Sequence, residues 1–378
     1  MHQRNPTKGL KVNNRIPVTT FEVRKDNWAE TRIFSHSMAT ELAPNQVLFK
    51  VARQALTANN ISYASSGDSL KYWEFFPAEA GWGRIPGMGW SEVIASAHPD
   101  IAVGERVWGF TPYSTHHKIL AGKVNKFSFS DVSDHRGGHA PVYCQFDRAA
   151  TNPIYEPQRE DQDSLLRGLF MTSWLVEDFI VTNNFFDAQV CLITSASSKT
   201  SIALGHSVKR RGKLRSIAIT SASNIAFCQS LGCYDSVIGY QDIADLNAAE
   251  AAVVVDMAGN AKIISELHQH YADNIKHSCR IGATHYSELG SVDGLPGALP
   301  QFFFAPSHVR ARSAELGAEQ LMQLLSTDYA GFRRFCDSWM KVVPSYGAQS
   351  MDDIYQAVLA GRADPVAGQV VSLSAEGE

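Results

Sequence analysis

Between residues 189 and 284, short apolar runs alternate with segments of helical periodicity, and no other feature limits the possible folds as strongly. The runs QVCLIT (189–194), RSIAIT (215–220), YDSVIGY (234–240), AAVVVDMAG (251–259) and KHSCRIGAT (276–284) are rich in β-branched residues. Amphipathic patterns such as SIALGHSVKRR and SNIAFCQSLG separate them. Strands of this kind predict a parallel sheet covered by helices on both faces, so the fold class is α/β.

The first part of the chain, to about residue 130, is predicted to form short strands and turns instead. NQVLFKVARQALT (45–57) has the apolar pattern of a strand, and glycines between residues 81 and 109 mark bends. Residues 131–163 are polar and turn-prone, which predicts a connecting loop. We expect a β-rich domain with this loop over residues 1–163, an α/β domain over 164–340, and a segment at 341–378 that returns to the first domain.

Composition limits the partners and the compartment. The net charge of -4 gives no reason to expect nucleic acid or an acidic membrane surface. The chain has no apolar run long enough to cross a membrane, and its start lacks the apolar core of a secretion signal. Its six cysteines are scattered without a metal-binding spacing, which favours the reducing cytoplasm and no metal site.

The turn after the first parallel strand, SASSKTS (195–201), is a candidate phosphate site. Such a turn needs main-chain N–H groups at a helix start and little side-chain bulk. Glycine suits it best, and serine and alanine come next. The candidate ligands are Ser195, Ser197, Ser198, Lys199 and Thr200. The alternative is a Ser/Thr turn that only caps the helix.

The end of the second strand, TSASN (220–224), indicates which dinucleotide the turn would bind. A site selective for NAD places an acidic residue there, to accept hydrogen bonds from the ribose hydroxyls. This chain has no carboxylate at that point, and Ser221, Ser223 and Asn224 can donate to a 2′-phosphate. The sequence therefore predicts NADP rather than NAD.

The order of these parts resembles the medium-chain dehydrogenase/reductase superfamily. The likeness rests on VLFKVARQALTANNISYASSG (47–67), PGMGWSEVIAS (86–96), VGERVWGF (103–110) and AGQVVSL (367–373), and it covers most of residues 15–375. It is greatest for the zinc-free quinone-oxidoreductase-like branch and, within it, for the DUF2855 proteins. The resemblance implies a GroES-like domain joined to a Rossmann domain, with NADP(H) and a small-molecule substrate between them. It also implies a homodimer through the edge of the nucleotide-binding sheet, where GALPQFFFAP (297–306) is apolar.

The resemblance also implies roles for single residues. Asn60 and Tyr63 would face the nicotinamide from the loop after the first long strand, and Thr172 would do so from a helix; these are the catalytic candidates. Further contacts to the cofactor would come from Tyr240, Met257, Gly259, Gly282, Ala283 and Arg310. For Asn60 and Tyr63 the alternative is that they only satisfy local backbone groups, and for Thr172 that it packs or caps a helix.

Departures from the superfamily pattern concern zinc. Zinc-dependent members have a cysteine after the first long strand and Gly-His-Glu where this chain has Gly87-Met88-Gly89. Zinc needs three or four ligands around one point, and these stretches supply none. We therefore expect a zinc-independent NADPH-dependent reductase that transfers hydride to a carbonyl or an activated C=C bond. The alternatives are a catalytically silent nucleotide-binding or regulatory protein, and a lyase or isomerase without net redox change.

Overall fold

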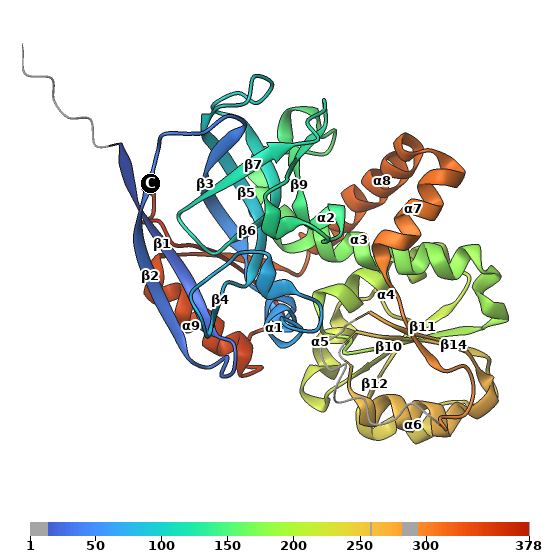
Figure 1. Ribbon diagram of the computed structural model, residues 1–378. Helices are drawn as coiled ribbons and strands as arrows, with labels where there is room; N and C mark the ends of the chain where they lie inside the picture. The colour runs from blue at the N-terminus through green and yellow to red at the C-terminus, as the bar shows by residue number, and fades with distance from the viewer. Residues whose placement is uncertain (1–13, 258, 282–293, 378) are drawn as a thin grey trace, which may run out of the picture.

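The computed structural model describes residues 14–257, 259–281 and 294–377. Its first half contains strands that close into a barrel. These are β3 (Gln46–Ala55), β5 (Pro86–Ser96), β6 (Arg106–Pro112), β7 (His116–Gly122), β8 (Ser128–Asp131) and β9 (Gln145–Arg148). They pair in the order β3-β5-β6-β9-β8-β7, and β7 also pairs with β3, which closes the ring (Figure 1). Alternate residues such as Val47, Phe49 and Phe146 fill the interior.

The barrel corrects one expectation, because residues 131–163 are not simply a loop. They contain β9, which pairs with β6 and β8, as well as the short helix α2 (Pro141–Cys144). β9 is the four-residue strand QFDR, and only Phe146 in it is buried. A strand with one inward apolar residue shows no alternation, which explains why the polar composition suggested a loop.

A small sheet and a helix lie outside the barrel ring. The strands β1 (Arg15–Arg24), β2 (Thr31–Ala39) and β4 (Trp82–Gly83) pair in the order β2-β1-β4. The helix α1 (Ala58–Ser65) follows β3 directly, so it stands at the end of a barrel strand.

The second half contains a parallel sheet of β10 (Val190–Thr194), β11 (Arg215–Thr220), β12 (Ser236–Gly239), β13 (Ala252–Asp256), β14 (Ile275–Arg280) and β15 (Pro300–Phe302). The strand order is β12-β11-β10-β13-β14-β15. Relative to β10 as strand 1 this is the 3-2-1-4-5-6 order of a Rossmann fold. All residues of β10 and β13 are buried, as expected for strands covered on both faces. The expected pairing of a GroES-like barrel with a Rossmann-type sheet is confirmed.

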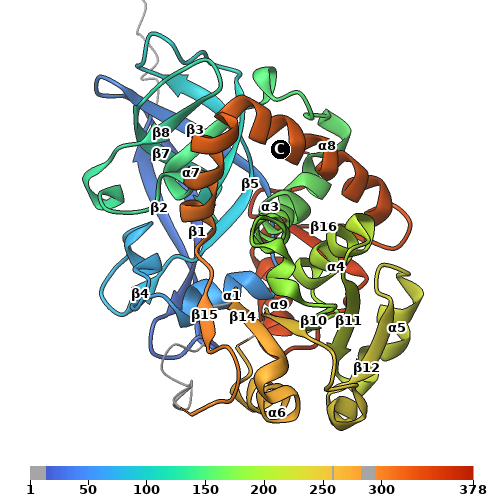
Figure 2. The same ribbon diagram turned by 90° about the vertical axis from the view of Figure 1, so that its right-hand side faces the viewer.

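Helices cover both faces of this sheet, as Figure 1 shows. They are α3 (Glu160–Thr182), α4 (Lys199–Arg211), α5 (Ile225–Ser230) and α6 (Ala261–Tyr271). The helices α7 (Ala305–Leu316) and α8 (Ala318–Cys336) pack against α3 and against each other. Cys191 and Ile193 of β10 face the core that includes α3, α4 and α8, while Val190 and Leu192 face α6. The α3 helix also contacts β3 and β5, so it lies between barrel and sheet (Figures 1 and 2).

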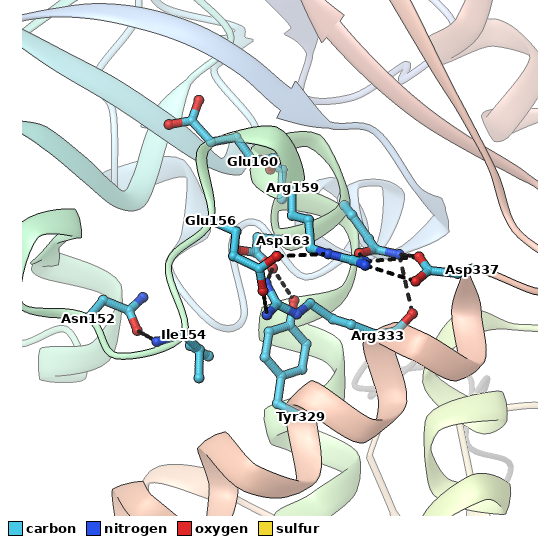
Figure 3. Close-up of polar contacts among 11 residues, drawn as sticks. Asn152, Ile154, Glu156, Arg159, Glu160, Asp163, Tyr329, Arg333 and Asp337 are labelled. Atoms are coloured by element: carbon cyan, nitrogen blue, oxygen red, sulfur yellow. Dashed lines mark hydrogen bonds and ion pairs between the residues drawn. The ribbon is translucent and has the colours of Figure 1, made fainter.

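A buried polar network fixes α8 to the start of α3 (Figure 3). The Asp163 carboxylate is 1% exposed and accepts hydrogen bonds from the Tyr329 hydroxyl at 2.8 Å and from Arg333 at 3.2 Å. Beside it, Arg159 donates two hydrogen bonds to Asp337, at 2.9 and 3.0 Å. Because buried charges are costly unless they are paired, this network favours one orientation of the two helices.

The last elements return to the barrel. β16 (Lys341–Tyr346) and β17 (Ala367–Ser372) pair in parallel, with α9 (Gly347–Leu359) between them in the sequence. β17 then pairs antiparallel with β3, where Val370 lies opposite Ala55. The C-terminal strands therefore extend the barrel sheet on the side from which α1 begins.

Candidate functional site

The turn between β10 and α4 has two backbone features that an anion site can use, a residue in the left-handed region and the start of a helix. Ser195 has φ +48°, in the left-handed region that favours glycine. Ser198 caps α4, and its hydroxyl accepts a hydrogen bond from the Ser201 amide at 3.1 Å. The amides of Lys199 and Thr200 are then the orphan donors of this helix start, which can bind an anion.

Hydroxyl and amide groups from neighbouring strand ends gather around this turn. Asn224, in the 3₁₀ turn after β11, donates to the Ser197 hydroxyl at 3.0 Å and to the Ser221 hydroxyl at 3.1 Å. The Ser221 and Ser223 hydroxyls are 3.1 Å apart. The hydroxyl of Tyr240, after β12, is 3.3 Å from that of Ser195.

These six residues form the donor cluster: Ser195, Ser197, Ser221, Ser223, Asn224 and Tyr240. In the part of the chain that the structure describes, no carboxylate bonds to it. Its hydroxyl and amide groups are the type of donor that binds phosphate oxygens, and the absence of a carboxylate avoids charge repulsion. The donor set therefore fits a phosphate ester.

The Lys199 side chain and the Thr200 carbonyl make contacts outside the predicted turn. The Lys199 ammonium donates to the carbonyl oxygens of Pro365 at 3.2 Å and Ala367 at 2.8 Å, at the start of β17. Burial lowers the pKa of Lys199 to about 8. The carbonyl of Thr200 accepts a hydrogen bond from Ser173 of α3 at 2.8 Å. These contacts join α4 to the barrel and to α3.

A buried carboxylate orders the loop after β13. Asp256 accepts hydrogen bonds from the Thr194 hydroxyl at 2.7 Å and from the Gly259 amide at 2.9 Å. The Met257 amide donates to the same Thr194 hydroxyl at 3.3 Å, and Gly259 has φ +74°. Met257 and Gly259 are thus held at the carboxyl ends of β10 and β13, where the strand order reverses and α/β folds bind ligands.

Both groups of the Asn60 amide are engaged in local structure. Its Oδ1 atom accepts from the Thr57 amide at 2.7 Å, and its Nδ2 atom donates to the Pro86 carbonyl at 2.9 Å. Asn60 is only 3% exposed. These bonds anchor the start of α1 to β5, which agrees with the alternative of a local backbone partner.

The catalytic candidates Tyr63 and Thr172 are also bonded to neighbouring groups. The Tyr63 hydroxyl is buried and accepts from Asn59 at 2.8 Å, and burial raises its pKa well above the usual value. The Thr172 hydroxyl donates to the Gly168 carbonyl in its own helix at 3.2 Å. A methyl group on Gly168 would come within 2.4 Å of the Met88 sulfur, so α3 packs closely on β5 at this point.

A model of the protein family of unknown function DUF2855 matches residues 54–364. The chain belongs to the DUF2855 family. None of the curated proteins matches it by sequence.

Solved structures show the fold of this DUF2855 protein. A mutant of Etr1p in complex with NADP and crotonyl-CoA has a TM-score of 0.59 at 12% identity, covering 95% of this chain and 100% of Etr1p. CurA from Vibrio vulnificus in complex with NADPH has a TM-score of 0.53 at 13% identity, covering 90% of this chain and 94% of CurA. A protein from Bacillus thuringiensis assigned as an NADPH:quinone reductase has a TM-score of 0.53 at 13% identity, covering 95% of this chain and 99% of its own. The fold is that of the medium-chain dehydrogenase/reductase superfamily.

Sequence reasoning overlooked Tyr72 of the DUF2855 chain. Tyr72 is half-buried in a 3₁₀ turn (Tyr72–Glu74), and its hydroxyl is 3.4 Å from that of Tyr143. Its ring centroid is 4.8 Å from that of Tyr63, and Met88 packs against the same aromatic group. Burial raises the pKa of Tyr72 well above the usual value, so the hydroxyl keeps its proton at neutral pH. Tyr72 lies nine residues after Tyr63, in a separate turn, so no helix or strand periodicity relates the two residues. The sequence offered one signal for Tyr72, which is that it is a second tyrosine shortly after β3.

Other predicted positions lie apart from the cluster or outside the described residues. Arg310 is exposed on α7, whereas its neighbour Arg312 bonds to Asp178 of α3 at 2.7 Å. Gly282 and Ala283 lie outside the described residues. Within the described ranges, no three His, Cys, Asp or Glu side chains gather as a metal site. No helix in those ranges has the length and apolar character needed to span a bilayer.

Proposed function

We propose that this protein is a zinc-independent, NADPH-dependent reductase that transfers hydride to a carbonyl or an activated C=C bond of a small organic substrate. The observation that carries the proposal is the donor cluster, which joins the turn after β10 to the end of β11 without a carboxylate. The fold supports it, since structures of this fold are described with NADP and crotonyl-CoA and with NADPH.

In this proposal the donor cluster binds the phosphates of NADPH. The hydroxyls of Ser221 and Ser223, ordered by the Asn224 amide, would donate to the 2′-phosphate, and the amides of Lys199 and Thr200 to the pyrophosphate. The loop of Met257 and Gly259, ordered by Asp256, would border the nicotinamide side. When bound, NADPH supplies the hydride.

The chain's own contribution to the chemistry is proton donation near the developing charge. Tyr72 is the better donor because its side chain is half-buried and can meet a substrate, whereas the Tyr63 side chain is buried. Tyr143, whose hydroxyl faces that of Tyr72, would orient it. The surrounding rings of Tyr63, Phe75 and Phe110 would favour a flat, apolar acceptor.

Cofactor choice tests the proposal directly. Asn224→Asp replaces an amide donor by a carboxylate of the same shape, so we expect the Kd for NADPH to rise at least about tenfold because of charge repulsion. The Kd for NADH should change less. Gln229→Glu, which adds one charge on the exposed side of α5, is the matched control. Titration followed by tryptophan fluorescence measures the Kd for NADPH and for NADH in each variant. Equal affinities of Asn224→Asp and Gln229→Glu for NADPH would contradict the phosphate assignment.

Turnover tests the catalytic part. With an enal, enone, aldehyde and quinone panel, we expect consumption of NADPH by the native protein and a loss of about 10²-fold or more in kcat for Tyr72→Phe. Tyr63→Phe should retain more activity, because the Tyr63 hydroxyl is not exposed. Equal losses in the two variants would argue against the choice of Tyr72.

One observation favours the alternative of a catalytically silent nucleotide-binding protein. Asn60 is buried and bonded to the Pro86 carbonyl, and Thr172 donates its hydroxyl proton within its own helix, so neither presents a donor to a substrate. Tight binding of NADPH without turnover on the whole panel, in the native protein, would support that reading.

We also propose domain borders near residues 163 and 340, a cytoplasmic location and a homodimer. All six cysteines are free and buried, which suits a reducing compartment. β15 is the last strand of its sheet, and the apolar residues beside it, Leu299 and Phe304, are 49% and 44% exposed. A second β15 could pair with this edge and cover them.

A further inference from the structure

Lys199 is the residue whose placement goes beyond its predicted role. It is the first residue of α4, beside the amides of the proposed pyrophosphate site, yet its ammonium reaches the carbonyls of Pro365 and Ala367. Those carbonyls belong to the segment that enters β17, a strand of the barrel sheet. A single side chain thus connects the two parts of the molecule at the cofactor end of α4.

The charge on Lys199 is poorly compensated. Carbonyl oxygens are its hydrogen-bond partners, and within the described residues no carboxylate forms an ion pair with it. The other ionisable groups that act on it are Cys336 at the end of α8 and Asp364 before β17. Burial raises the pKa of the Cys336 thiol, so that group is neutral, and Asp364 acts only at a distance. A positive charge at a helix N-terminus also meets the positive end of the helix dipole.

The strand that Lys199 holds leads to the catalytic candidates. Beside β17, the Gln369 carbonyl accepts a hydrogen bond from the Leu56 amide at 3.0 Å, directly before α1 begins. On its other side, a methyl group on Gly368 would come within 2.5 Å of Leu165 in α3. β17 therefore has little room to shift without moving α1 or α3.

We propose that Lys199 is a positioning residue that holds the barrel strand β17 against the cofactor end of α4, and that its unpaired charge makes cofactor binding depend on its protonation. The proposal rests on the proposed NADPH site. The pyrophosphate would supply the negative charge that the buried ammonium lacks, so the bound form would favour protonated Lys199.

The pH dependence follows from this linkage. The pKa of Lys199 is lowered to about 8 by burial, and a nearby pyrophosphate would raise it. Between about pH 8, the pKa of Lys199 in the free protein, and the higher pKa in the bound protein, NADPH binding is therefore accompanied by uptake of a proton. We expect the Kd for NADPH to be constant at pH 6.5–7.5 and to rise by about tenfold towards pH 9.5.

Variants separate the charge from the contact. Lys199→Met should weaken NADPH binding at pH 7 by about tenfold and leave a Kd that no longer rises above pH 8. Lys199→Arg keeps a charge that does not titrate, so its Kd should also stay flat but lie closer to the native value. Lys213→Met, an exposed lysine just beyond the other end of α4, is the control and should keep the native profile.

Calorimetric titration with NADPH from pH 6.5 to 9.5, in buffers of different ionisation enthalpy, measures both Kd and proton uptake. Proton uptake above pH 8 in the native protein and in Lys213→Met, but not in Lys199→Arg, supports the proposal. If Lys199→Met does not fold, the native profile and Lys199→Arg carry the test. A native Kd that is flat to pH 9.5 overturns the inference and leaves the cofactor assignment intact. Failure of the native protein to bind NADPH at pH 7 overturns the proposed function itself.

Discussion

Ser195 bears a backbone conformation that a glycine would adopt more easily. Its φ of +48° costs a non-glycine residue about 1–2 kcal/mol. Ser195→Gly removes this cost, but it adds entropy to the unfolded chain and loses the contact with Tyr240, so we expect a net gain of at most about 0.5 kcal/mol in the free energy of unfolding. Ser195→Ala keeps the strain and also loses the contact with Tyr240, so it should be less stable than the native protein. Urea denaturation ranks the three proteins, and a glycine variant less stable than the alanine variant would contradict this account.

Asn60 should matter for stability before it matters for any reaction. Asn60→Ala leaves the Thr57 amide and the Pro86 carbonyl without their partner in a buried site. We expect it to lower the free energy of unfolding by about 2–4 kcal/mol, measured by urea denaturation. Asn59→Ala, at the exposed neighbouring position, removes only the hydrogen bond to the Tyr63 hydroxyl and should lower it by about 1 kcal/mol. Unchanged stability in Asn60→Ala would return Asn60 to the list of catalytic candidates.

The sequence predicted which residues lie together better than it predicted the contacts of each side chain. Ser197, Ser221 and Asn224 could be predicted because strand ends of one parallel sheet meet at the same edge. The contacts of the Lys199 ammonium could not be predicted. Its partners lie some 170 residues later in the chain, and the pairing of β17 with β3 brings them to the start of α4. The contribution of Asp256 was visible only as a carboxylate at the end of a buried strand.

At the level of elements, two side chains of α7 bind it to α3. None of its residues is buried, but its His308 and Arg312 side chains donate to Asp178 of α3 at 2.8 and 2.7 Å. Burial opposes ionisation of Asp178, but hydrogen bonds from His308 and Arg312 outweigh it and lower the pKa of the carboxyl below 3.8.

Removing this carboxylate should destabilise the protein in a pH-dependent way. We expect Asp178→Asn to lower the free energy of unfolding by about 3 kcal/mol at pH 7. Because the folded-state pKa of Asp178 is lowered, its contribution is complete above the ordinary pKa and disappears as the pH falls through the lowered value. The difference from the native protein should therefore shrink below pH 4. Urea denaturation at pH 7 and pH 3 measures it, with the exposed Asp273→Asn as control; an equal difference at both pH values would exclude this role.

At the level of the whole molecule, the homodimer can be tested through β15. Leu299→Glu places a charge beside the sheet edge, where it would be buried in the dimer, so we expect the variant to be monomeric at micromolar concentration. Val103→Glu changes an apolar residue that is 65% exposed on the barrel, and it should leave the mass unchanged. Sedimentation equilibrium gives both masses. A native monomer, or a dimer that survives Leu299→Glu, would exclude this interface.

The parallel sheet could be predicted from the sequence in more detail than the barrel could. The parallel sheet followed from its apolar runs, since strands buried on both faces leave a continuous signal. The barrel was foreseen only as a β-rich region, because its closure depends on short strands such as β9 and on the pairing of β3 with β7. Pairings between distant segments leave no local pattern.

The position of β17 also has a consequence for the order in which the protein is made. β17 contains residues 367–372, yet it pairs with β3, which begins at residue 46. During synthesis the Rossmann sheet, complete at β15, leaves the ribosome before the strand that extends the barrel sheet exists. The barrel sheet is therefore completed only after the Rossmann sheet, although β3 is translated before it, and the end of β3 stays unpaired on this side until residues 367–372 have been made.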